Sequence, residues 1–138
     1  MRLFAKIIIV TTSVYTTLGG KPSNVEQLTK ANFSERIKWA TGGAVVEYRT
    51  PWCGGCQMME KSFNDLANRL SSTAKRIMFA TVNCDEEAAI CSRFVTVGYP
   101  TIVVYHNGSE SNFKRFVGYL DKKELDEEVG KELERKKV

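Results

Sequence analysis

The pattern of apolar and polar residues divides the chain into short blocks that predict strands and helices in alternation. Apolar runs at residues 44–48, 77–82 and 101–105 have the length of buried strands, and the first contains a single acid. The third run leads into Asn-Gly within residues 106–109, which is a strong signal for a hairpin turn. Residues 113–117 are therefore expected to return as the partner strand.

Helical spacing of apolar residues appears between and after these runs. Asn32 is placed to cap a first helix, with Glu35 at the reciprocal position of a capping box. Helices are expected over residues 33–40, 53–70 and 88–94, and around the apolar stripe Leu125, Val129 and Leu133.

The predicted order is β-α-β-α-β-α-β-β-α, with a short first strand near residues 25–28. Alternating strands and helices require parallel crossover connections, whereas the final hairpin adds an antiparallel edge. The sequence therefore predicts an α/β fold with a central mixed sheet flanked by helices. One domain over residues 21–138 accounts for the whole pattern.

Composition and charge agree with a single globular domain. The chain has 138 residues, of which 43% are hydrophobic and 26% are charged. Its formal net charge is +4, and without Arg2 and Lys6 there remain 18 basic and 16 acidic residues, or +2. These charges are mixed along the chain, so we expect no nucleic-acid binding.

The first residues resemble an export signal. Arg2 and Lys6 give a positive start, an apolar stretch with interspersed threonines covers residues 7–18, and residues 19–20 are small. We expect residues 1–20 to be a cleaved signal peptide, because the apolar stretch is too short to span a bilayer. The alternatives are a buried strand or an uncleaved anchor. Export would place the protein in the endoplasmic reticulum lumen or outside the cell, with no stable membrane insertion after cleavage.

Residues 51–56, Pro-Trp-Cys-Gly-Gly-Cys, carry the clearest chemistry. Cys53 is expected at a helix N-terminus, where free N–H groups and the helix dipole lower a thiol pKa. Cys56, one turn inside, would be the resolving thiol. The alternatives are an inert disulfide or half of a zinc site completed by Cys84 and Cys91. The six-residue gap of that second pair is wider than zinc sites usually have, so no metal is expected.

The segment Val45–Cys56 resembles the active-site segment of the protein disulfide isomerase family. Gly98–Thr101 resembles that family's cis-proline loop, and Cys84 and Cys91 resemble an extra disulfide of some lumenal members. The likeness covers about residues 25–133. It implies a thioredoxin-like fold and a structural role for the second cysteine pair; a second redox-active pair is the alternative.

The resemblance also implies roles for single residues. Pro100 would follow a cis peptide bond beside the cysteines and bind an extended client. Trp52 and Tyr99 would contribute apolar client contacts. Glu47, an acid in a buried strand, would exchange a proton with Cys56. The alternatives are that Pro100 is an ordinary turn proline and that Glu47 reaches the surface or pairs with a lysine.

The chain departs from the family at three positions. Gly55 replaces the histidine that usually precedes the second active cysteine, Arg49 stands in place of an aromatic residue, and Leu120 replaces an arginine. Arg49 could add positive potential near Cys53 or lie at the surface. The loss of the arginine puts efficient oxidase activity in doubt. His106 is expected to be a surface residue of its turn.

These features predict a thiol–disulfide oxidoreductase of the isomerase type that exchanges disulfides with protein clients through Cys53 and Cys56. No cofactor is expected because the electrons stay on sulfur, and the protein is expected to be a monomer. The alternative is a client-binding, thioredoxin-like chaperone module with little redox turnover. Asn32 and Asn107 both begin glycosylation triplets, which the sequence alone does not rank.

Overall fold

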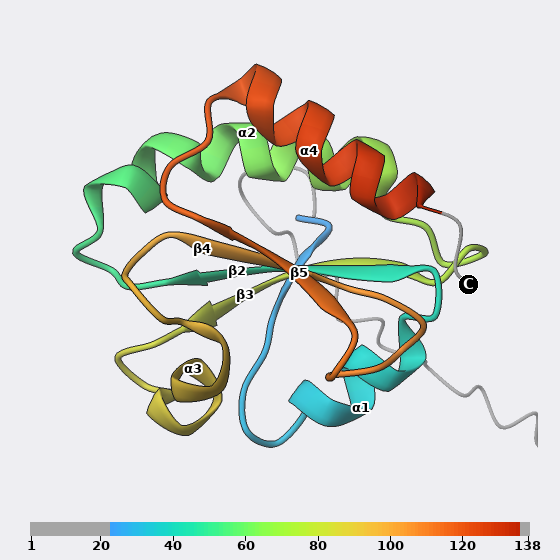
Figure 1. Cartoon of the computed structure of the whole chain (residues 1–138), viewed down its shortest axis with the longest axis horizontal. Coiled ribbons are helices and arrows are strands. Elements are labelled where there is room, and N and C mark those ends of the chain that lie inside the picture. The colour runs from blue at the N-terminus through green and yellow to red at the C-terminus, as the bar shows by residue number, and fades with distance from the viewer. Residues whose placement is uncertain (1–22, 136–138) are drawn as a thin grey trace, which may run out of the picture.

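A computed structural model describes residues 23–135 as nine elements in the predicted order (Figure 1). The elements are β1 (Val25–Gln27), α1 (Phe33–Trp39), β2 (Gly43–Arg49), α2 (Gly54–Leu70), β3 (Ile77–Asn83), α3 (Ala88–Phe94), β4 (Thr101–Tyr105), β5 (Phe113–Val117) and α4 (Lys122–Glu134). The expected α/β fold with a mixed sheet flanked by helices is confirmed.

The five described strands form one sheet in the order β1-β3-β2-β4-β5. Strands β1 and β2 run parallel to β3, β4 is antiparallel to β2, and β5 is antiparallel to β4. Figure 1 shows α2 and α4 on one face of this sheet and α1 and α3 on the other. The central strand β2 is therefore covered on both sides, which explains its nearly continuous apolar sequence.

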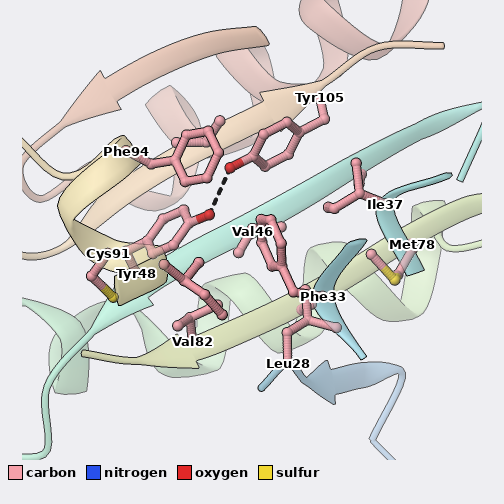
Figure 2. Close-up of a cluster of buried hydrophobic side chains, with 14 of the residues drawn as sticks. Leu28, Phe33, Ile37, Val46, Tyr48, Met78, Val82, Cys91, Phe94 and Tyr105 are labelled. Atoms are coloured by element: carbon pink, nitrogen blue, oxygen red, sulfur yellow. Dashed lines mark hydrogen bonds between the residues drawn. The ribbon is translucent and has the colours of Figure 1, made fainter. Parts of the chain in front are cut away.

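An aromatic cluster fills the side of the sheet that faces α1 and α3 (Figure 2). Phe94 of α3 stacks on Tyr48 of β2 at 5.7 Å between ring centroids and meets Tyr105 of β4 edge-on at 5.2 Å. The two tyrosine hydroxyls are buried and hydrogen-bond to each other at 2.6 Å. The two tyrosine hydroxyls thus satisfy each other's hydrogen bonding, so neither is left buried without a partner.

The opposite side of the sheet packs against α2 and α4. Its buried residues are Val45, Phe79, Ile102 and Val104 from the sheet, Met59, Phe63, Leu66 and Ala67 from α2, and Leu125 and Val129 from α4. Successive side chains of a strand point to opposite faces, so Glu47 lies on the same side as Val45. The acid of β2 is therefore directed toward the helix that begins at the cysteines.

The capping box predicted for α1 is wrong. Asn32 makes no side-chain cap hydrogen bond to the helix, because its Oδ1 accepts the backbone N–H of Thr29 at 2.7 Å in the preceding turn. A capping box is present at α4 instead. There Asp121 accepts the Glu124 N–H at 2.8 Å, and the Glu124 carboxylate accepts the Asp121 N–H at 3.0 Å.

The expectation that His106 lies at the surface is also wrong. Only 8% of its surface is exposed, because the turn after β4 packs under the end of α4. His106 Nε2 lies 2.8 Å from the Glu132 carboxylate, which Arg135 also contacts at 3.1 Å. The single histidine is thus a buried link between β4 and the last helix.

The expected signal peptide at residues 1–20 lies outside the described residues. Between residues 23 and 135, none of the helices combines the length and the apolar character that crossing a bilayer requires.

Candidate active site

The residues that begin α2 give Cys53 a distinct position. Cys53 is the N-cap residue of the helix, with an extended backbone, and its Sγ accepts the backbone N–H of Cys56 at 3.1 Å. The chain turns into this position through a hydrogen bond from the Cys53 N–H to the Thr50 carbonyl. Because helix N-terminal N–H groups favour negative charge, the same site would stabilise a Cys53 thiolate.

Cys53 and Cys56 are joined by a disulfide, with their Cα atoms 5.2 Å apart. Cys53 is 6% exposed and Cys56 is fully buried. Cys53 is therefore the one residue of the pair that reaches the surface. In the dithiol form, this arrangement would let Cys53 react with the disulfide of another protein while Cys56 stays buried next to it.

The loop before β4 lies against this turn. The Tyr99–Pro100 peptide bond is cis, as expected. A Cβ atom added at Gly55 would lie 3.3 Å from Cδ of Pro100 and 3.6 Å from Cβ of Tyr119, so the proline ring contacts the helix start directly. The Pro100 carbonyl accepts the Gly118 N–H at 2.9 Å, which fixes the loop to the end of β5.

Exposed apolar side chains occur in the segments that lead to and contact the start of α2. Trp52 is 68% exposed and meets Tyr99 edge-on at 6.0 Å. Val97 is 82% exposed just before the cis-proline, and Tyr119 is 46% exposed beside Gly55. The sequence pointed to Trp52 and Tyr99 but missed Val97 and Tyr119. Val97 follows α3 and Tyr119 follows β5, and each lies next to a glycine in a loop. Residues in loops have no regular spacing, so the sequence did not indicate that the two belong to one surface.

Glu47 is a buried carboxyl group without a hydrogen bond. Its side chain is 1% exposed, and neither oxygen has a hydrogen-bond partner among the described residues. Burial raises the pKa of Glu47 to about 7, although the Arg49 guanidinium lowers the pKa and Glu60 raises it further. A carboxyl group that titrates near neutral pH can both accept and return a proton.

Arg49 faces Glu47, with 3.5 Å between Nη1 and Oε1. The Arg49 side chain is 21% exposed, so it lies partly at the surface, and its contact with Glu47 is an interaction that the sequence did not suggest. Leu120, which replaces the family arginine, packs partly buried against the cluster on the α2 side of the sheet. An aliphatic contact thus occupies the position where the family commonly carries a charge.

The second cysteine pair forms a disulfide from the end of β3 to α3. Cys84 and Cys91 are 7% and 4% exposed, and their Cα atoms are 5.7 Å apart. The loop that this bond closes also contains Asp85, whose carboxylate accepts the Trp52 indole N–H at 3.2 Å. The second disulfide therefore lies in a segment that contacts the exposed tryptophan beside Cys53.

Comparison with known proteins places these features in a family. The Thioredoxin family model matches residues 24–131. The chain is 36% identical over 109 residues to a probable protein disulfide-isomerase A6 of Medicago sativa, covering 79% of this chain and 29% of the relative. It is 35% identical over 86 residues to the rice protein disulfide isomerase-like 2-2, covering 62% and 23% of the two chains.

Among solved structures, the chain is similar to chloroplastic thioredoxin z. The TM-score is 0.67 at 21% identity, and the match covers 81% of this chain and 96% of that one. This likeness concerns the fold. The chain spans less than a third of the length of the disulfide-isomerase relatives, so it corresponds to one part of those proteins.

Proposed function

This chain belongs to the thioredoxin family, and we propose that it catalyses thiol–disulfide exchange with protein clients through Cys53 and Cys56. The observation that carries the proposal is the position of Cys53. Its sulfur accepts the Cys56 N–H at the start of α2, and Cys53 is the more exposed residue of the pair. The names of the disulfide-isomerase relatives support the same class of chemistry.

In the reducing direction, the Cys53 thiolate attacks one sulfur of a client disulfide. A bond forms between Cys53 and that sulfur, and the other client sulfur leaves as a thiolate that takes up a proton. Cys56 then loses its proton to Glu47 and attacks the Cys53 sulfur. This step forms the Cys53–Cys56 disulfide and releases the second client thiol; the oxidising direction reverses both steps.

Client binding would use the apolar surface formed by Trp52, Val97, Tyr99 and Tyr119 together with the cis-proline loop. An extended client segment can hydrogen-bond to the backbone beside Pro100 as an added strand. Because these hydrogen bonds involve only the client backbone, this mode of binding does not depend on a particular client sequence. We therefore propose unfolded or partly folded proteins with thiols or disulfides as the clients.

Insulin reduction by dithiothreitol tests the activity. The unaltered protein should accelerate the reaction, and Cys53→Ser should abolish the acceleration. Cys56→Ser should instead accumulate a covalent client adduct that is visible on a non-reducing gel, because the resolving step is missing. Equal activity of Cys53→Ser and the unaltered protein would contradict the proposal.

A binding module with little turnover is the second candidate. The observation that favours it is the exposed apolar surface, which includes side chains as exposed as Val97 at 82%. A chaperone of this kind would suppress aggregation of a reduced client equally well with Cys53→Ser and Cys56→Ser together. Loss of that suppression in the double variant would assign the effect to disulfide exchange.

We further propose that residues 1–20 direct the chain into the secretory pathway, and that residues 21–138 act there as a monomer without a cofactor. The charged and apolar blocks of the first residues support this placement. Expression in a eukaryotic cell should give a microsomal, protease-protected product. Its mass should lack the first 20 residues, and its sedimentation should be that of one chain.

A further inference from the structure

The fold places the two Asn-X-Ser triplets, Asn32–Ser34 and Asn107–Ser109, in different surroundings. Such a triplet is the acceptor for an N-linked glycan, a bulky hydrophilic group that a folded protein carries at its surface. The glycan is attached to the side-chain nitrogen of the asparagine, Nδ2. The contacts of each asparagine side chain therefore decide which triplet can carry a glycan in the folded chain.

The first triplet is part of the turn before α1. Asn32 Oδ1 accepts the Thr29 N–H at 2.7 Å, and Asn32 Nδ2 donates to the Gln27 carbonyl at 3.4 Å. The middle residue, Phe33, is 2% exposed and belongs to the aromatic cluster (Figure 2). A glycan on this Nδ2 would have to fit between Asn32 and the end of β1, and it would disturb the turn that leads into α1.

The second triplet lies in the turn between β4 and β5. Asn107 is exposed, and within residues 23–135 no hydrogen bond involves its side chain. The Ser109 hydroxyl hydrogen-bonds to the hydroxyl of Ser111 in the same loop at 3.0 Å. Neither polar side chain of this triplet therefore connects it to another element of the fold.

The backbone of this turn is held in place on both sides of Asn107. His106 is buried, and its carbonyl accepts the Ser109 N–H at 3.0 Å. Gly108 has a φ of +65°, and a Cβ atom there would lie 2.5 Å from the Lys38 carbonyl oxygen of α1. The turn thus requires glycine at the middle position of the triplet, where an acceptor triplet excludes only proline.

The turn lies at the end of the sheet opposite to the active cysteines. Strand β2 leads into Cys53, whereas β4 is antiparallel to β2 and leads into Asn107. The two ends of the sheet are separated by the length of β2, which has seven residues and spans about 23 Å at about 3.3 Å per residue. Figure 1 shows the turn after β4 beside α1, away from the start of α2. A glycan on Asn107 would therefore leave the client surface uncovered.

We propose that Asn107 is the N-glycosylation site of this chain and that Asn32 is not modified in the folded protein. This inference rests on the proposed function, because the glycan donor is found only where the chain enters the secretory pathway. Asn107 Nδ2 attacks the anomeric carbon of an oligosaccharide linked to a lipid diphosphate. A C–N bond forms, the bond from that carbon to the diphosphate breaks, the lipid diphosphate leaves with the electron pair, and Nδ2 loses one proton.

The test expresses the full chain in a eukaryotic cell and treats the product with peptide N-glycosidase. The treatment should increase the gel mobility and convert residue 107 to aspartate, which identifies the site in the peptide mass spectrum. Asn107→Gln and Ser109→Ala should each abolish the mobility change, whereas Ser109→Thr should retain it.

The matched control is Ser34→Ala, which removes the first triplet and keeps the side-chain contacts of Asn32. This variant should carry the same glycan as the unaltered protein. A glycan that is lost in Ser34→Ala, or that persists in Asn107→Gln, would overturn the assignment. Insulin reduction should be equal before and after the glycan is removed; a change in rate would contradict its position away from the clients.

A second chain, in which the signal of another secreted protein replaces residues 1–20, separates this inference from the proposed function. If this chain is protected in microsomes and carries no glycan, the assignment of Asn107 is wrong, whatever the thiol–disulfide exchange activity. If only this chain is protected and it carries a glycan at residue 107, the acceptor site is supported and the proposed role of residues 1–20 is refuted.

Discussion

Replacing Glu47 with glutamine should change how the stability of the oxidised protein depends on pH. The pKa of Glu47 is raised from 4.5 to about 7 in the folded protein, chiefly by burial. Between these two values the folded chain retains a proton that the unfolded chain has released. The free energy of unfolding therefore falls as the pH rises through this range.

The size of the effect follows from the shift in pKa. A difference of about 2.5 units at about 1.4 kcal/mol per unit gives about 3 kcal/mol, present below pH 4.5 and lost above pH 7. Glutamine keeps the shape of the protonated acid and cannot ionise. Glu47→Gln should therefore gain about 3 kcal/mol relative to the unaltered protein between pH 4 and pH 8.

Urea denaturation at a series of pH values measures this difference. The remaining titratable groups are common to both proteins, so their contributions cancel when the two free energies are subtracted. Glu127→Gln, at an exposed position of α4, is the matched control and should show a constant difference. A difference that also stays constant for Glu47→Gln would refute the view that Glu47 is a desolvated acid.

Three other predictions concern the cysteines and residue 55. In the reduced protein Cys53 should react first with iodoacetamide, as followed by mass spectrometry, because Cys56 is fully buried; faster labelling of Cys56 would reverse the two roles. Replacing Cys84 and Cys91 with alanine should lower the free energy of unfolding by about 2.5 kcal/mol, the chain-entropy value for an eight-residue loop, and should spare most insulin reduction. Loss of turnover without loss of stability would instead make that pair redox-active. Gly55→His should make the Cys53–Cys56 pair more oxidising and Gly55→Pro more reducing when titrated against glutathione, where about 30 mV corresponds to about 1.4 kcal/mol. If the Gly55→His variant has the same reduction potential as the unaltered protein, then residue 55 does not set the potential of the Cys53–Cys56 pair.

Local patterns were sufficient to predict most of the fold and the main site. The strand and helix order depends on patterns within elements of 3–17 residues, and the Cys53–Cys56 motif is contained within one turn of a helix. Such signals do not require knowledge of the tertiary structure. The position of Glu47 was predictable for the same reason, since an acid within an apolar strand is unusual in any arrangement.

Contacts between distant segments could not be predicted in this way. His106 and Glu132 are 26 residues apart, and nothing in either segment indicates that the turn after β4 meets the end of α4. The failure at Asn32 is a local competition, because the same side chain can cap a helix or close the preceding turn. Arg49 was ambiguous because a strand's pattern fixes the face of a side chain but not the atom that it contacts.

The two disulfides also bear on how this protein avoids reacting with itself. A protein that exchanges disulfides has its own cross-link among the possible substrates, and four cysteines allow three pairings. Each observed bond joins cysteines only three or seven positions apart, whereas any alternative pairing must close a loop of about 30 residues at a larger entropic cost. Burial does not distinguish the two pairs, because Cys84 and Cys91 are 7% and 4% exposed and Cys53 is 6% exposed. The short loops alone thus favour the observed pairing over an exchange of partners between the two disulfides.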